Sequence, residues 1–175
     1  MKKKFIILFF AIALPGFVNA QFNSVILKVD GLTCSACSFS TQKSILQLDF
    51  VDDVKIDLNS HDAIVTFKPA KKISIDKISK KVYDAGFSVG SLDAVFTFNS
   101  KEISDSTCFE FEGDIYHFEQ MPQKTVLNGI TTIKFISEKY MSKSEFKKWK
   151  KIIHNDVCKK PDNFSGKMYH VILLK

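Results

Sequence analysis

Apolar residues in the first half of the chain recur with the periods of six short elements. Strands are expected from apolar runs or strict alternation, and helices from apolar spacings near 3.6. The predicted strands are residues 25–29, 54–58, 63–67 and 87–89. One predicted helix is the segment without proline or glycine at residues 38–48, and the other begins near the candidate N-caps Ser74 and Asp76. The order strand–helix–strand–strand–helix–strand predicts an α+β protein with a ferredoxin-like βαββαβ sandwich.

The second half is predicted to be a small, mainly antiparallel α+β unit. Glu112-Gly113-Asp114 is a hairpin turn signal between two strand-like segments. Ser142 and Glu145 form a capping box that opens a helix from Lys143 to about Asn155. The predicted strands here are residues 94–98, 108–111, 115–118, 125–136 with an interruption at 128–129, and 168–174. We therefore expect two domains, residues 21–92 and 93–175, and the second contains no catalytic motif that predicts its function.

Residues 1–20 have the pattern of a secretory signal peptide. Three lysines at positions 2–4 precede a wholly apolar segment at residues 5–14, and small residues at positions 18 and 20 precede Gln21. The apolar segment is too short to remain as a membrane anchor. We expect export to the periplasm or the medium, with Gln21 as the first mature residue and no integral membrane segment in the mature chain.

The charge of the chain argues against one class of partner. The 25 basic residues outnumber 19 acidic residues, which gives a net charge of +6, and all of the basic residues are lysines. Proteins that read nucleic acids normally use arginine for bidentate contacts to bases and phosphates. Together with the expected export, the lack of arginine predicts that nucleic acid is not a partner.

Cys34 and Cys37 form a Cys-x-x-Cys pair between the first predicted strand and the first predicted helix. The free N–H groups and positive dipole of a helix N-terminus stabilise thiolates. Two thiolates suit Cu(I) or Hg(II), which accept near-linear pairs, whereas structural Zn(II) would lack two of its usual four ligands. The pair predicts a site for one soft metal ion.

Three motifs in order and at matching distances resemble the heavy-metal-associated domain family. They are Gly31-Leu32-Thr33-Cys34-Ser35-Ala36-Cys37, the hairpin at residues 51–69, and Asp84-Ala85-Gly86-Phe87. The resemblance implies that Cys34 and Cys37 are the metal ligands, that Leu32 anchors their loop and that Phe87 packs beside it. Leu32 departs from the commonest methionine, which is a near-isosteric change.

The same resemblance predicts which metal ions the site prefers and which kind of protein receives the ion. Thr33 before the first cysteine is similar to the copper and mercury members, so we expect Cu(I) first, Hg(II) next and Zn(II) last. The implied function is to carry or buffer the ion and pass it by thiolate exchange to a metal-transporting membrane protein or another carrier. This is transport, so the protein is expected not to be an enzyme.

Two other functions remain open for Cys34 and Cys37. A thiol–disulfide oxidoreductase uses the same spacing at a strand–helix junction. Alternatively, the pair forms an inert disulfide in an exported protein and the chain acts as an interaction module.

Cys108 and Cys158 are predicted to form a disulfide. Export favours this bond, and a loop of about 50 residues closed in this way stabilises a small domain by roughly 3–4 kcal/mol. A four-ligand metal site with His117 and His154 is the alternative. His61 is expected in a solvated turn and His170 in the last strand, neither as a metal ligand.

The first predicted helix leaves one further question open. Phe39 and Leu46 are seven residues apart on a face adjacent to the family's usual core positions. They are expected either to dock against the second half or a partner, or to be buried in the first domain by a slight rotation of the helix.

Overall fold

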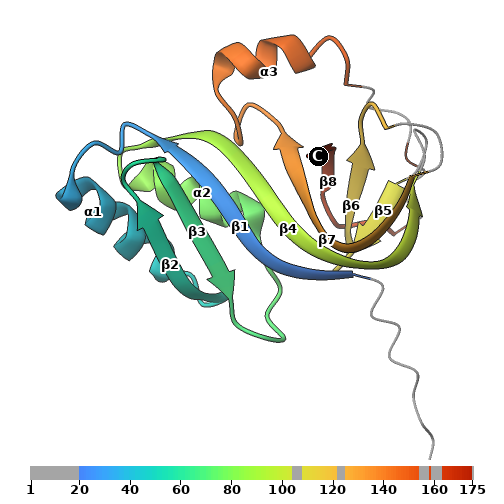
Figure 1. Ribbon diagram of the computed structural model, residues 1–175, viewed down its shortest axis with the longest axis horizontal. Helices are drawn as coiled ribbons and strands as arrows, with labels where there is room; N and C mark the ends of the chain where they lie inside the picture. Colours follow the sequence, from blue (N-terminus) through green and yellow to red (C-terminus); the bar gives the residue numbers. More distant parts are fainter. Residues whose placement is uncertain (1–19, 104–107, 122–124, 154–157, 159–162, 175) are drawn as a thin grey trace, which may run out of the picture.

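The computed structural model describes residues 20–103, 108–121, 125–153, 158 and 163–174 (Figure 1). The predicted signal peptide lies outside this part of the chain, except for Ala20. Among the described residues, no helix has the length and apolar character needed to cross a membrane.

The first half has the predicted ferredoxin-like βαββαβ order. Its elements are β1 (Ala20–Asp30), α1 (Ser35–Leu46), β2 (Val51–Asp57), β3 (Asp62–Phe67), α2 (Ile75–Asp84) and β4 (Ser88–Ile103). The four strands are antiparallel neighbours in the order β2-β3-β1-β4, and both helices cover one face of the sheet (Figure 1). Ile45 of α1 and Ile78 and Val82 of α2 are fully buried in the core. Ser44 Oγ donates a 2.7 Å hydrogen bond to the carbonyl oxygen of Lys81, which joins the two helices.

The second half extends the same sheet. Its elements are β5 (Cys108–Phe111), β6 (Asp114–Phe118), β7 (Thr125–Ile136), α3 (Lys143–Trp149) and β8 (Met168–Leu174). The order of the whole sheet is β2-β3-β1-β4-β7-β8-β6-β5, and only the β6–β8 pair is parallel among its strand pairs in the described residues. This half is therefore the predicted mainly antiparallel α+β unit.

Strand β4 crosses the expected boundary between residues 92 and 93. The separate strands predicted at residues 87–89 and 94–98 are wrong, because one strand runs from Ser88 to Ile103. The intervening Gly90-Ser91 has turn-like composition, but Leu92 pairs with Leu27 of β1 and Asp93 pairs with both β1 and β7. A Cβ added at Gly90 would lie 2.5 Å from Oδ1 of Asp30, so a larger residue there would require the Asp30 side chain to move. The division into two domains stays a prediction.

Aromatic side chains form a core that continues between the halves. Phe96 of β4 is fully buried, and its ring stacks on that of Phe22 in β1 with centroids 4.5 Å apart. The same ring meets Phe111 and Tyr116 edge-on at 5.4 and 5.8 Å. Because Phe96 contacts rings from both halves, hydrophobic burial couples them.

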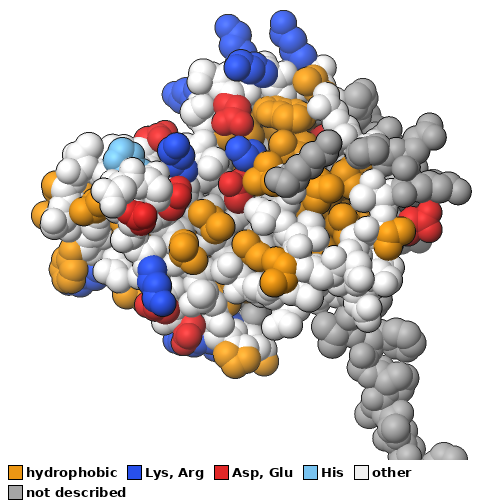
Figure 2. Space-filling view, in the orientation of Figure 1, with side chains coloured by type: hydrophobic (Ala, Val, Ile, Leu, Met, Phe, Trp, Pro, Cys, Tyr) orange, Lys and Arg blue, Asp and Glu red, His pale blue; other side chains and the backbone are white. Residues whose placement is uncertain are grey.

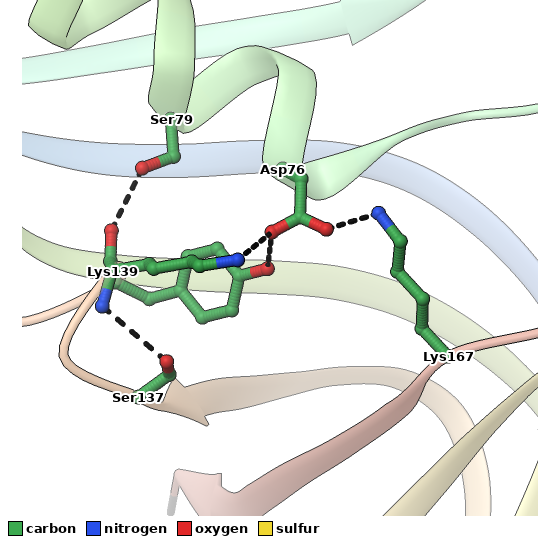
Figure 3. Close-up of polar contacts among 6 residues, drawn as sticks. Asp76, Ser79, Ser137, Lys139 and Lys167 are labelled. Carbon is green, nitrogen blue, oxygen red and sulfur yellow. Dashed lines mark hydrogen bonds and ion pairs between the residues drawn. The ribbon is translucent and has the colours of Figure 1, made fainter.

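A polar cluster at the N-terminus of α2 also joins the halves (Figure 3). Tyr140 donates a 2.5 Å hydrogen bond to Oδ1 of Asp76, and Lys139 and Lys167 form ion pairs with the same carboxylate. Burial by itself would raise the pKa of Asp76, but the hydrogen bonds from Lys167 and Tyr140 and the charges of Lys167 and Lys139 outweigh it and lower the pKa. Ser79 Oγ adds a 2.7 Å hydrogen bond to the carbonyl oxygen of Lys139.

Two helices differ from the predictions. Phe39 is 65% exposed and Leu46 is 43% exposed, so neither burial in the first domain nor docking against the second half occurs; contact with a partner stays open. Helix α3 begins where the capping box predicts, with Ser142 Oγ accepting from the N–H of Glu145, but it ends at Trp149. Its exposed lysines gather above the sheet (Figure 2).

Candidate metal site

A tight turn after β1 places the two cysteines at the start of α1. Gly31 has a φ of 86°, which favours glycine, and the N–H of Thr33 donates to the carbonyl oxygen of Gly31 at 3.0 Å. Leu32 is fully buried and so anchors the turn in the core. Cys34 is the N-cap of α1 in an extended conformation, and Cys37 lies in the first helical turn. The predicted strand-to-helix placement of the pair is confirmed.

The N-terminus of α1 is electrostatically suited to hold negative sulfur. The backbone N–H of Cys37 donates to Sγ of Cys34 at 3.1 Å, so this sulfur is the capping acceptor of the helix. The first turn of α1 contains no acidic residue that would oppose a thiolate. The positive end of the helix dipole therefore favours the thiolate over the thiol.

The site is open on one side and packed on the other. Cys34 is exposed, whereas Cys37 is half-buried against the hydrophobic core. The ring of Phe87 would lie 3.6 Å from a Cβ placed at Gly31, so it packs beside the loop as the family resemblance implies. A partner's sulfur could reach an ion held here without any rearrangement of the core.

Cys34 and Cys37 are joined as a disulfide in the structure, with Cα atoms 5.1 Å apart. In this form the sulfurs cannot bind a metal ion, because the ligand is the thiolate. A two-electron reduction would give two thiols on neighbouring positions of the same turn. The pair can thus exist as a disulfide or as two thiols, and its role as a ligand set stays a prediction.

The structure also joins Cys108 and Cys158 in a disulfide, with Cα atoms 5.8 Å apart. The described residues do not form the alternative four-ligand site, because both sulfurs are part of the disulfide. Cys108 is the cross-strand neighbour of His117, and His154 lies outside the described residues. His61 lies in the turn between β2 and β3 with a φ of 60°, as expected for a turn residue. His170 lies in β8, and its Nδ1 is 2.8 Å from Oε1 of Glu119.

Residues 26–88 match the model of the heavy-metal-associated domain. A mercuric transport protein periplasmic component of Pseudomonas fluorescens is 40% identical over 70 residues, which are 40% of this chain and 76% of that protein. The corresponding protein of Serratia marcescens is 39% identical over 87 residues, 50% of this chain and 93% of the relative. A copper-transporting ATPase of Oryza sativa is 34% identical over 68 residues, 39% of this chain and 7% of the ATPase.

Among solved structures, oxidized MerP from Ralstonia metallidurans is similar, with 37% identity and a TM-score of 0.36. The similarity covers 41% of this chain and 94% of that one. The family motifs, the observed βαββαβ order and the mercuric relatives matched over most of their length agree. The chain belongs to the heavy-metal-associated domain family.

Proposed function

We propose that the protein carries one soft metal ion between Cys34 and Cys37. The observation that carries this proposal is the position of the two sulfurs at the N-terminus of α1, with the sulfur of Cys34 capped by the N–H of Cys37 and exposed to solvent. In the reduced protein, binding forms two metal–sulfur bonds, and each sulfur that is still protonated releases its proton to water. Membership of a metal-binding family supports this use of the pair.

Hg(II) is the first candidate for the ion and Cu(I) the second. The relatives matched over most of their own length are named as mercuric transport proteins, whereas the copper-transporting ATPase is matched over a small part of its length. This reverses the order expected from the sequence alone. Both ions accept two thiolates, and Zn(II) remains disfavoured because the loop supplies only two ligands.

Transfer would proceed by exchange of thiolates. An incoming thiolate of the acceptor adds to the two-coordinate ion to give a three-coordinate intermediate, after which one of the two cysteine sulfurs leaves. A second exchange releases the ion to the acceptor. The exposure of Cys34 makes it the sulfur that a partner reaches first, and the half-buried Cys37 would leave last. The acceptor is proposed to be a metal-transporting membrane protein or another carrier.

We further propose that this exchange takes place in the periplasm. The named location of the mercuric relatives and the signal-like residues 1–20 support that compartment. It is an oxidising compartment, where the Cys108–Cys158 bond would persist as a structural cross-link. The Cys34–Cys37 bond must be reduced by a thiol donor before the ion binds. The function is transport, with no chemical conversion of a substrate.

Anaerobic titration of the reduced protein tests the proposal. Hg(II), Cu(I) and Zn(II) would be added in competition with a chelator, beside a Cys34→Ser/Cys37→Ser variant treated in the same way. The variant corrects for any metal bound by Cys108 and Cys158. One additional tight equivalent of Hg(II) or Cu(I) in the wild type is expected. Equal binding by the two proteins would exclude a metal site at Cys34 and Cys37.

A thiol–disulfide oxidoreductase is the second candidate, because the structure holds the pair in its oxidised form with Cys34 exposed. Such an enzyme would reduce insulin at the expense of dithiothreitol and have a potential in the thioredoxin-to-isomerase range. Insulin reduction that is lost in the Cys34→Ser/Cys37→Ser variant would favour this function. Tight metal binding without such activity would favour transport.

A further inference from the structure

Three side chains from the second half converge on one point within the sheet. His117 of β6 and His170 of β8 are register partners in the parallel strand pair. Glu119 follows His117 by two positions, so both side chains point to the same face of the strand. The N–H of Glu119 donates to the carbonyl oxygen of Val171 at 2.8 Å, which continues the β6–β8 ladder and fixes the backbone of Glu119.

The potential ligand atoms are already close together. Oε1 of Glu119 lies 3.1 Å from Nδ1 of His117 and 2.8 Å from Nδ1 of His170. One ligand atom from each residue can be chosen so that all lie within 4.8 Å of one another. In a tetrahedral zinc site with bonds of about 2.0–2.1 Å, ligand atoms lie roughly 3.3 Å apart. Small side-chain adjustments would therefore bring the three groups to coordination distances.

Burial makes this arrangement costly without a cation. The side chains of His117 and Glu119 are only 3% and 4% exposed, and that of His170 is 15% exposed. Among the described residues, Nδ1 of His117 has no hydrogen-bond partner: it is near the carboxylate oxygen but not aligned with it. A buried polar atom left unpaired costs about 1–3 kcal/mol. A cation between the three groups would use the lone pair of this nitrogen and offset the buried carboxylate charge.

We propose that His117, Glu119 and His170 bind a divalent transition-metal ion, for which Zn(II) is the probe. Two imidazoles and one carboxylate are the donors that ions of borderline softness prefer, in contrast to the soft-ion pair Cys34 and Cys37. Three protein ligands leave a fourth position for water or another small ligand. The chain would then hold two sites of different chemistry, one in each half.

A cavity adjoins one member of this cluster. His170 is among the residues that line a cavity of about 590 Å³ between α2, α3 and the start of β8. Lys139, Lys150 and Lys167 line the same cavity together with Asp76, whose carboxylate is paired with Lys139 and Lys167. Cys108 is the cross-strand partner of His117, and its bond to Cys158 keeps its sulfur from acting as a thiolate ligand.

The test uses the full mature chain with Cys34→Ser/Cys37→Ser and the Cys108–Cys158 bond kept oxidised. No thiolate is then available, so the result is independent of the metal carrier function. Zn(II) would be titrated against a chromophoric chelator, with the melting temperature followed in parallel. One equivalent of Zn(II) and a rise in melting temperature are expected. Glu119→Gln and His170→Asn, added singly to this background, should each weaken binding by at least 100-fold, whereas His61→Asn in the hairpin turn should leave it unchanged.

A spectroscopic measurement keeps the test decisive if a variant fails to fold. Co(II) bound to the cysteine-free site of the intact protein should give visible bands of a nitrogen- and oxygen-ligated tetrahedral ion, without sulfur charge-transfer bands. Zn(II) binding that survives both Glu119→Gln and His170→Asn would overturn the proposal. So would a background protein that binds neither Zn(II) nor Co(II), in which case the three residues form only an internal polar cluster.

Discussion

Phe96→Ala is the sharpest test of how the two halves are joined. The side chain is fully buried in β4, beyond the expected boundary at residue 92. Its ring stacks on Phe22 from β1 and meets Phe109 of β5 edge-on at 6.2 Å. If the halves unfold as one unit, removing this ring destabilises both.

The expected loss follows from the packing around the ring. A buried phenylalanine replaced by alanine costs about 3–5 kcal/mol, because apolar burial is lost and a cavity is left behind. Phe96 also forms stacked or edge-on contacts with five rings, namely Phe22, Phe98, Phe109, Phe111 and Tyr116. We therefore expect a loss of about 4 kcal/mol in the free energy of unfolding. For a chain of this size, that lowers the melting temperature by about 8–16 °C.

Urea unfolding followed by two probes measures the loss and the coupling together. Trp149 is the single tryptophan and lies in α3, so its fluorescence reports on the second half. Far-UV circular dichroism reports on the strands and helices of both halves. Coincident transitions that move together in Phe96→Ala are expected of one cooperative unit. Ile130→Ala, at an exposed position of β7, is the control and should change stability by less than about 0.5 kcal/mol.

Two results would refute this reasoning. A loss below about 1 kcal/mol would mean that Phe96 does not hold the core together. A circular dichroism curve with a second step that Phe96→Ala leaves unchanged would mean that the halves unfold independently, in agreement with the division at residues 92 and 93.

Three further predictions concern the polar cluster, the disulfide and the exposed face of α1. Tyr140→Phe should cost about 1.5–3 kcal/mol at neutral pH, since it removes a 2.5 Å hydrogen bond to the Asp76 carboxylate. The folded-state pKa of Asp76 is lowered from 3.8, so the stabilisation by the ionised carboxylate is present above about pH 4 and is lost as the pH falls further. Acid unfolding curves of the wild type and the variant would measure this loss. Cys108→Ser should lower the free energy of unfolding in urea by about 4 kcal/mol, because it opens a loop with a sequence separation of 50. The metal stoichiometry at Cys34 and Cys37 should not change. Phe39→Ser combined with Leu46→Ser should change the melting temperature little, because both side chains are exposed.

Each of these predictions has a distinct contrary outcome. A cost of Tyr140→Phe that stays constant down to the lowest pH at which the protein is folded would mean that the hydrogen bond does not depend on an ionised Asp76. A loss of one metal equivalent in Cys108→Ser would favour a thiolate ligand over a structural cross-link. A large destabilisation by the double serine variant would show that the α1 face is covered in the protein in solution.

Local patterns predict the elements of the first half well, because the apolar period of each segment can be recognised without knowing which strand it pairs with. Alternation at residues 54–58, followed by a polar turn and the strand-like residues 63–67, gives the hairpin, and the cysteines before a helix-forming segment give the loop. The continuity of β4 is not predictable in this way. Gly90 and Ser91 look like a turn, and only pairing with β1 and with the distant β7 keeps them extended.

The His117, Glu119 and His170 cluster could be found only in part from the sequence. The spacing of His117 and Glu119 on an alternating segment places them on one face of a strand, which is a usable signal. The approach of His170 depends on parallel pairing of β6 and β8, two strands that are not consecutive in the chain. No local pattern specifies such a pairing, because the partner is chosen by the packing of the whole sheet. The exposure of Phe39 is unpredictable for the same reason: tertiary packing decides which apolar face of a helix is covered.

The single extended strand β4 also affects how the first half would behave in isolation. Within the βαββαβ unit, β1 pairs with one side of β4, and β7 from the second half pairs with the other over residues 93–103. A fragment that ends at Ile103 would present that side as a long row of unpaired N–H and C=O groups, the feature that promotes strand addition and aggregation. The outer strand β2 at the opposite end of the sheet carries Asp52, Asp53, Lys55 and Asp57, whose charges discourage such pairing. In the whole chain, β7 of the second half pairs with this side of β4, whose residues Ala94–Phe98 carry no charged side chain that would discourage pairing with another strand.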